Sequence, residues 1–151
     1  MATVDDFPVS FHFQVDFQKL GDHFQVSFTE VSGLDIRYET IPKPNDMGTR
    51  VQVLQGQRFG NITLKRPVSS NKVKDPFTTW VSKIFSPDTK KFVVTYDAII
   101  KLLDAEGSPI AGWKCSCTYP VHWTFSELNA EKSGLVMETV VLACNRIERI
   151  T

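Results

Sequence analysis

Hydrophobic and polar residues alternate with a period of two over much of the chain, which is the pattern of strands with one buried face. The clearest alternation marks two strands near the start, with Phe11, Phe13, Val15 and Phe17 in the first and Phe24, Val26 and Phe28 in the second. Gly21 and Asp22 separate these runs, so we predict a β-hairpin. A second hairpin is predicted from a strand over residues 91–103, a turn over 104–107 and a return strand over 111–119.

One helix is expected between the two hairpins. Asp75 is a favoured N-cap residue, and Pro76 suits the first helical position, where its missing N–H group is not needed. Apolar residues then follow at helical spacing, namely Phe77, Trp80, Val81 and Ile84, before Pro87. The spacing predicts a short amphipathic helix that ends near Pro87 and packs on a sheet.

The other segments are less regular. Residues 36–38 also alternate. A strand that starts at 51–53 is interrupted at Gly56 and Gly60 and resumes at 62–64, and Pro67 is predicted to end it because proline lacks a ladder donor. The intervening segment holds Pro42, Pro44, Asn45, Asp46 and Gly48. This composition predicts a long irregular loop over 41–49. After a bend at Pro120, residues 121–125 alternate again, and a loop over 126–134 precedes a last strand over 135–147.

About seven strands in hairpins, one helix and no βαβ spacing indicate a mainly β protein, an antiparallel β-barrel or sandwich with the helix at its side or mouth. At 151 residues the chain fits one domain, 1–151. Hydrophobic residues make up 42% and charged residues 23%, which is usual for globular proteins. The 17 basic and 17 acidic residues leave no net charge, which disfavours a nucleic-acid-binding surface.

The beginning of the chain does not resemble a secretory signal. Residues 1–6 are acidic and lack a basic start followed by an apolar run. No stretch approaches the roughly 18 uninterrupted apolar residues of a membrane-spanning helix. We therefore expect synthesis and assembly in the cytoplasm, with no direct membrane anchoring.

Motifs for catalysis and for nucleotide binding are missing: there is no G-x-S-x-G elbow, no phosphate-binding loop and no G-x-G-x-x-G run. The three histidines fall on separate predicted elements: His12, His23 and His122. Cys115 and Cys117 are separated by one residue and Cys144 is remote, which is not the spacing of a structural zinc site. Two groups of charged residues are expected to be solvated: Lys65 and Arg66, and Glu127, Glu131 and Glu138. We predict no enzyme activity, no metal and no cofactor.

Two predicted strands carry apolar residues on both faces. They are Ile99, Ile100, Leu102 and Leu103 in one strand, and Val140, Val141 and Leu142 in the other. A solvated face of an antiparallel sheet is usually polar. Either the helix or another subunit therefore covers the second face, and these residues alone leave both explanations open.

Several strings, read in order, resemble the tube-protein family of contractile phage tails, extracellular injection systems and, more distantly, type VI secretion. They cover nearly the whole chain: residues 7–15, 28–35 (FTEVSGLD), 60–66 (GNITLKR), Trp80, 102–107, Trp113, 119–123, 128–130 and 137–142. The chain departs from the family pattern at Tyr119, where tryptophan is frequent, at Gln55-Gly56, where Pro-Gly is usual, and at Pro67, where glycine is expected. Residues 143–146 also lack the usual His-Glu-Gly.

The resemblance implies a structural subunit that forms stacked hexameric rings, a hollow tube whose lumen passes protein or DNA cargo. The tube would lie inside a sheath, with baseplate and spike proteins at one end, in a virion tail or an extracellular or cell-anchored injection particle. The main tube, a minor paralogue and a ring next to the baseplate all remain open. We expect contacts between subunits at Ile41, Pro42, Lys43, Pro44 and Met47 of the loop, and at Ile99, Leu103 and Val141.

Two other functions are weighed against this one. The first is a monomeric β-barrel module that binds a small ligand or glycan, with Trp113, Tyr119 and Trp123 as a stacking platform. The second is a hydrolase that uses His122 with Glu127 or a cysteine, and no sequence motif supports it. For residues 41–49, the alternative to a contact role is a flexible surface loop without a partner.

Overall fold

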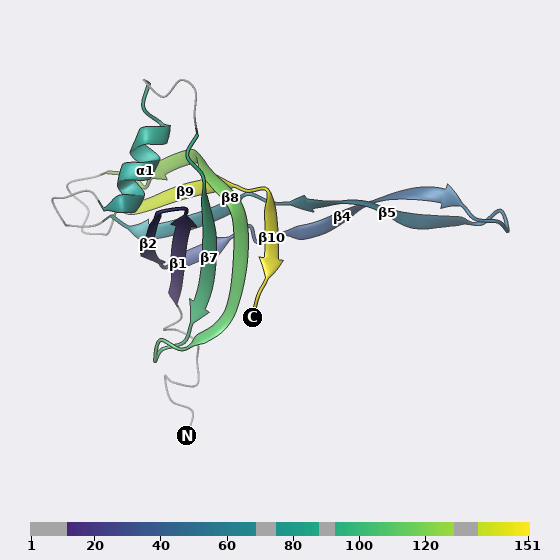
Figure 1. Cartoon of the computed structure of the whole chain (residues 1–151), viewed down its shortest axis with the longest axis horizontal. Coiled ribbons are helices and arrows are strands. Elements are labelled where there is room, and N and C mark those ends of the chain that lie inside the picture. Colours follow the sequence, from purple (N-terminus) through teal and green to yellow (C-terminus); the bar gives the residue numbers. More distant parts are fainter. Residues whose placement is uncertain (1–11, 69–74, 88–92, 129–135) are drawn as a thin grey trace.

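The computed structural model describes residues 12–68, 75–87, 93–128 and 136–151. They form a curled β body, one helix and a long two-stranded arm that projects from the body (Figure 1). The strands are β1 His12–Lys19, β2 Asp22–Phe28, β3 Glu30–Ser32, β4 Ile36–Pro44, β5 Arg50–Phe59, β6 Ile62–Pro67, β7 Tyr96–Leu103, β8 Pro109–Phe125, β9 Met137–Ala143 and β10 Arg146–Arg149. The helix α1 is Pro76–Ile84.

The body is one antiparallel sheet in the order β2-β1-β7-β8-β9-β6-β3, with β10 also paired to β8. Its two end strands are consecutive in the chain, because only Thr29 separates β2 from β3. The Thr29 amide donates to the carbonyl of Lys65 on β6 at 2.9 Å, which draws the two margins of the sheet together. The mainly β, antiparallel fold with one helix is confirmed. The predicted closed barrel is not, since no closed barrel is found among the described strands.

Helix α1 matches its prediction. The Asp75 carboxylate accepts from the Thr78 amide at 2.8 Å, and Phe77, Trp80 and Val81 are buried. Phe77 packs on Phe17 and Phe28, with ring centroids 5.3 and 5.4 Å apart. The helix therefore packs over the margin where β2 approaches β6, and it completes the hydrophobic core that the sheet leaves open.

Both predicted hairpins are present. Strands β1 and β2 pair with Val15 opposite Val26, and β7 and β8 pair with Ile100 opposite Trp113. β8 continues through Pro120 as one strand, with an irregular register between Pro120 and His122 in place of a separate strand. The predicted last strand divides into β9 and β10, and the short strand β3 was not predicted. The parts of these predictions at Phe11, 91–92 and 129–135 lie outside the described residues.

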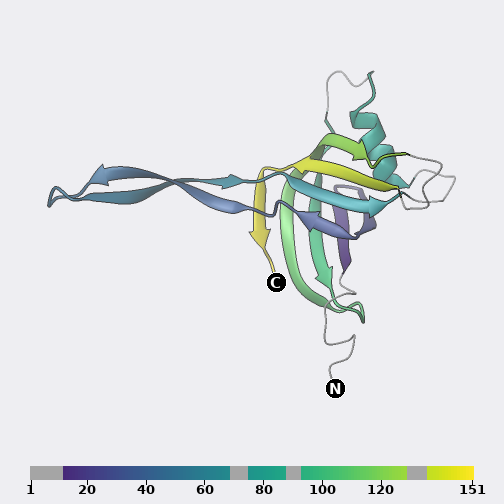
Figure 2. The same ribbon diagram turned by 180° about the vertical axis from the view of Figure 1, so that it is seen from behind.

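The prediction of an irregular loop over 41–49 is wrong. These residues belong largely to the arm, in which β4 and β5 pair from Ile36 and Phe59 at the root to Pro44 and Arg50 near the tip (Figure 2). The prolines misled because they usually end strands. Pro42 and Pro44 have the same parity, so their missing N–H groups point to one edge of the strand. A strand in a two-stranded ribbon has an unpaired edge, where proline is tolerated.

The strands with two apolar faces are partly covered within the chain. Ile100, Leu103, Val140 and Leu142 are buried. Ile99, Leu102 and Val141 are half-buried. The folded chain thus accounts for part of the apolar pattern.

Candidate assembly interface

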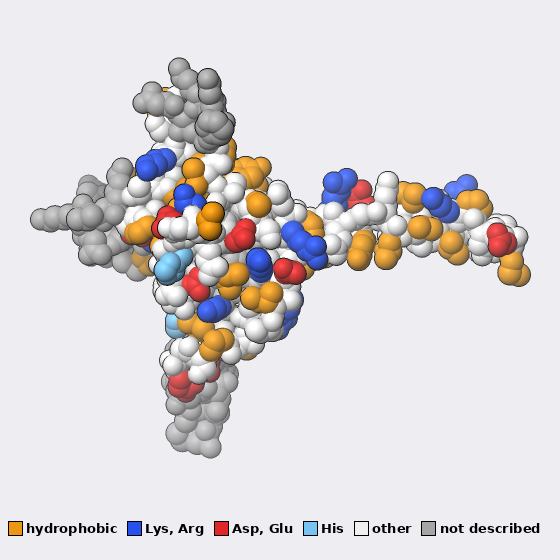
Figure 3. Space-filling view, viewed as in Figure 1, with side chains coloured by type: hydrophobic (Ala, Val, Ile, Leu, Met, Phe, Trp, Pro, Cys, Tyr) orange, Lys and Arg blue, Asp and Glu red, His pale blue; other side chains and the backbone are white. Residues whose placement is uncertain are grey.

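Among the described residues, the arm exposes more large apolar side chains than any other strand pair. Met47 is 89% exposed and Leu54 is 61% exposed. Ile36, Tyr38 and Val51 are also exposed, and the apolar side chains follow the whole length of the arm (Figure 3). A ribbon of two strands is marginally stable in water unless something packs on it. These side chains therefore form a surface suited to a protein partner.

A bulge divides the arm into two halves with different chemistry. The register shifts between Glu39 and Thr40. On the root side, Arg58 binds Glu39 through two hydrogen bonds of 2.8 and 3.2 Å. Hydrogen bonding with Arg58, together with its positive charge, lowers the pKa of Glu39 below its ordinary value. On the tip side, Ile41 lies opposite Val53. The root half thus adds an exposed ion pair across the strands, and both halves expose apolar side chains.

The turn at the tip is held by one side chain. The Asn45 carboxamide oxygen accepts from the amides of Met47 and Thr49 at 3.0 and 2.8 Å, and the Asn45 amide donates to the Thr49 carbonyl at 2.7 Å. This is the behaviour of asparagine in tight turns. Met47 is thereby fixed at the far end of the arm, where nothing in the described chain covers it.

The other predicted contact residues lie on the body. Ile99 on β7 is half-buried between its cross-strand neighbours Asp16 and Lys114. Val141 on β9 is half-buried between Thr63 and His122. Leu103 is only 6% exposed, so little of its side chain is available to a partner. The structure therefore brings the five predicted arm residues together, and it places the remaining three elsewhere.

The aromatic residues of the alternative ligand-binding platform are not brought together. Trp113 and Trp123 both lie on β8, separated along the strand by ten residues, a path of roughly 30 Å. The Arg149 guanidinium covers Trp113 with its carbon 5.3 Å from the ring centroid. Trp123 packs between Phe85 and Phe125, at 6.1 and 5.3 Å. The two tryptophans therefore pack against different neighbours and do not stack on a common surface.

The candidate catalytic and metal-binding residues are also dispersed. His12, His23 and His122 lie on β1, β2 and β8, and His122 is exposed. Burial raises the pKa of Cys115 to about 12, with a smaller effect of Cys144, so its thiol remains protonated. The described residues contain no group of three or more His, Cys, Asp or Glu side chains that could hold a metal ion. In the same part of the chain, no helix is long and apolar enough to cross a membrane.

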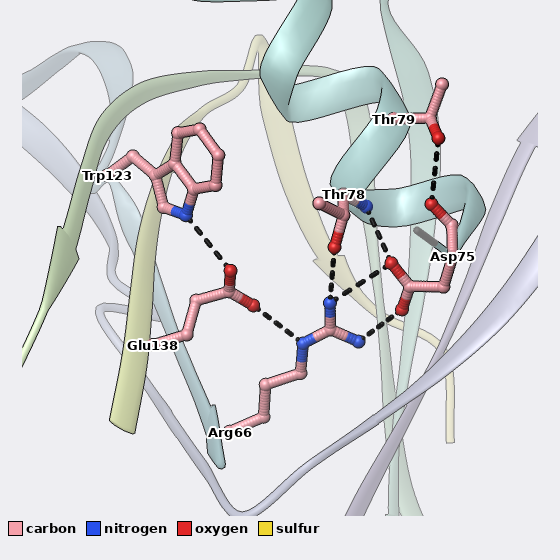
Figure 4. A network of polar contacts seen from close by, with 6 residues as sticks. All are labelled: Arg66, Asp75, Thr78, Thr79, Trp123 and Glu138. Atoms are coloured by element: carbon pink, nitrogen blue, oxygen red, sulfur yellow. Dashed lines mark hydrogen bonds and ion pairs between the residues drawn. The ribbon is translucent and has the colours of Figure 1, made fainter. Parts of the chain in front are cut away.

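A buried polar network, which the sequence did not suggest, holds α1 on the sheet (Figure 4). The Arg66 guanidinium donates to Glu138 on β9 at 2.8 Å and to Asp75 at 2.6 and 3.2 Å. It also donates to the Thr78 hydroxyl at 3.0 Å, and the Trp123 indole N–H donates to Glu138 at 3.1 Å. The expectation that Arg66 and Glu138 are solvated is therefore wrong. A signal existed, because Arg66 has the same parity as the core residues Ile62 and Leu64.

Burial and hydrogen bonding act in opposite directions on this network. Burial alone would raise the pKa of Asp75, but hydrogen bonds from Arg66 and Thr78 lower it to about 2. Burial disfavours the charged form of Arg66, yet Asp75 and Glu138 raise its pKa above the ordinary value. The group is thus a charged, fully paired brace, and its position between helix and sheet indicates a structural role.

The fold is that of tube proteins from contractile injection systems. The chain resembles a chain of the anti-feeding prophage cap (AFP tube terminating cap) with a TM-score of 0.73 and 25% identity, covering 95% of this chain and 89% of that one. It resembles a chain of the PVC sheath-tube complex, from an extracellular contractile injection system in the extended state, with a TM-score of 0.73 and 23% identity, covering 91% and 87%. A chain of the AFP baseplate gives a TM-score of 0.74 at 19% identity, covering 99% and 97%.

The sequence places the protein in a family. Residues 9–148 match the T4-like virus tail tube protein gp19 family. The chain belongs to this family of structural tube proteins, which confirms the resemblance seen in the sequence. Comparison with curated proteins gives no match.

Proposed function

We propose that the chain is a subunit of the inner tube of a contractile injection system or phage tail, and that six copies form each of the stacked rings around a lumen. The lumen passes protein or DNA cargo, and the tube assembles in the cytoplasm with sheath, baseplate and spike proteins. No catalytic step belongs to this role. Family membership and the sheath-tube, cap and baseplate neighbours support it.

The arm is the observation that carries the proposal. In its tip half, Pro42 and Met47 are exposed and Ile41 is half-buried opposite Val53, and the arm projects away from the body of its own subunit (Figure 1). No described element of the body packs on the tip half of the arm. The partner that packs on it is therefore another copy of the same chain. An arm on one side that docks on a different surface of the next copy makes a head-to-tail contact, which closes into a ring or continues as a filament.

The body residues play a smaller part in this proposal. Ile99 and Val141 are half-buried on its outer faces and gain further burial when a neighbouring body packs on them. Fully burying a side chain of this size contributes about 1.5 to 3 kcal/mol. Ile99 and Val141 are already half-buried, so each would contribute less than this to the contact. Lys43 and Pro44 lie beside Ile41 on the same strand and contact the neighbour with it.

The test is a matched pair of substitutions at one arm position. Ile41→Asp places a charge in the proposed contact, whereas Ile41→Val retains an apolar side chain with high strand propensity. We expect both purified variants to melt as the native chain does, because Ile41 lies outside the core. Electron microscopy should show tubes for Ile41→Val and none for Ile41→Asp. Tubes of normal number and length in Ile41→Asp would refute the role of the arm.

A cryo-electron microscopy map of the parent particle tests the larger claim. We expect six copies of this chain in each ring, with the tip of every arm in contact with another copy. A position outside any hollow cylinder, or a functional monomer, would refute the proposed function.

A further inference from the structure

Two of the strings that resemble tube proteins meet in space at the root of the arm. Gly33 belongs to the linker between β3 and β4, and Gly60 belongs to the linker between β5 and β6. The Gly60 amide donates to the Asp35 carbonyl at 3.0 Å, so the two linkers are joined by a backbone hydrogen bond. The first arm pair, Ile36 opposite Phe59, follows directly.

Neither linker has room for a side chain at its glycine. A Cβ atom on Gly33 would lie 2.0 Å from the Asn61 carbonyl oxygen, and the residue has a φ of +84°, which other residues rarely adopt. A Cβ atom on Gly60 would lie 3.0 Å from the Cβ atom of Asp35 and 3.0 Å from the Gly33 carbonyl oxygen. Each linker therefore occupies the space that a side chain on the other would need.

Both linkers are also attached to the body. Leu34 and Phe59 flank the crossing and pack against the hydrophobic core. The Cys144 thiol, between β9 and β10, lies 3.8 Å from the Gly60 carbonyl oxygen. The crossing is thus fixed relative to the body, and it fixes the direction in which the arm departs (Figure 2).

We propose that Gly33 and Gly60 form a steric clamp that sets the direction of the arm and so positions its tip on the neighbouring copy. This inference rests on the proposed function. With about 3.3 Å per residue, the arm is about 30 Å long. A rotation of about 10° at its root would move the tip by about 5 Å, which is the spacing between adjacent strands. Close packing at the root is therefore required for a contact at the tip.

The test compares Gly60→Ala with Gly56→Ala. An added Cβ atom at Gly60 meets the crossing linker, whereas one at Gly56, within the arm, meets nothing within 4 Å. Spin labels introduced as unnatural amino acids at Met47 and Leu20, both highly exposed, report the distance between arm tip and body. Tubes are counted with unlabelled chains, because Met47 belongs to the proposed contact. We expect a shifted or broadened distance distribution and a loss of tubes for Gly60→Ala, and native behaviour for Gly56→Ala.

The outcomes separate this inference from the proposed function. A native distance distribution in Gly60→Ala overturns the clamp, whatever the tubes show. A shifted distribution with normal tubes overturns the clamp as an assembly device. Normal tubes in Ile41→Asp would instead remove the arm contact itself. Circular dichroism of each variant confirms a folded body, and Gly33→Ala, which has the closer contact, should lose tubes at least as completely as Gly60→Ala.

Discussion

The brace around Arg66 gives the most direct test of how the helix is held. We consider Arg66→Met, which retains an unbranched side chain of similar length and removes the guanidinium. The Arg66 side chain is 11% exposed and its partner Glu138 is 7% exposed, whereas Asp75 is 34% exposed. The substitution thus leaves the buried Glu138 carboxylate without its cation. It also removes the cation from Asp75, which is already partly solvated.

The expected loss in the free energy of unfolding comes mainly from Glu138. Removing one member of a buried ion pair typically costs about 3 to 5 kcal/mol, because the remaining charge is uncompensated. Glu138 still accepts from the Trp123 indole N–H, which favours the lower part of that range. Asp75 adds little, since water screens a carboxylate that is one-third exposed. We expect a loss of about 3 kcal/mol, which lowers the melting temperature by roughly 10 °C in a domain of this size.

Urea denaturation of the purified chain at pH 7 measures this loss. The matched control is Arg58→Met, which removes an exposed ion pair with Glu39 on the arm and should not change the midpoint measurably. Replacing Glu138 by Met in the Arg66→Met background should restore part of the stability, because no buried charge then remains. A loss below about 1 kcal/mol in Arg66→Met would refute the reasoning that the buried charges need each other.

Three further predictions concern the same core. The pKa of Asp75 is about 2 in the folded chain, below its ordinary value of 3.8, so its contribution to stability is present above pH 3.8 and is lost as pH falls toward 2. Asp75→Asn, which still caps the helix, should therefore flatten the stability profile between pH 4 and about 2 in thermal melts. Phe77→Ala should cost about 3 to 5 kcal/mol in urea denaturation, because its ring is buried among aromatic neighbours. Cys115 should resist iodoacetamide at pH 8 in the native chain and react in urea, as followed by mass spectrometry, since burial raises its pKa to about 12.

Local signals in the sequence sufficed for the elements that local chemistry determines. The N-cap of Asp75, the position of Pro76 and the spacing of Phe77 and Trp80 act within one helical turn or between adjacent turns, so they predicted α1 correctly. Alternation of side chains joined by a short turn likewise predicted the β1–β2 and β7–β8 hairpins. The parity of Arg66 was also available, but its partners Asp75 and Glu138 come from distant segments that the sequence alone does not bring together.

Features that depend on long-range pairing were missed. The kink at Thr29 lets β2 pair with β1 while β3 pairs with β6, and no residue pattern specifies which strand each half selects. The barrel prediction failed for this reason, because closure depends on which strands form the two margins. The arm was missed for a different reason: the prolines in β4 outweighed the alternation of Ile36 and Tyr38. Proline excludes a central strand, but it does not exclude a strand with a free edge.

The arm combines unpaired strand edges with exposed apolar side chains. Together these features favour assembly more strongly than the apolar side chains would alone. A long ribbon that exposes both edges and apolar side chains is prone to aggregation in a monomeric protein. This arm nevertheless has a structured tip turn at Asn45, which sets its register, and a crowded root at Gly33 and Gly60. Such features order the ribbon before it meets a partner, which reduces the entropy lost when the contact forms. An apolar arm of defined register and direction is therefore suited to one specific and repeated neighbour, as in the proposed tube of identical subunits.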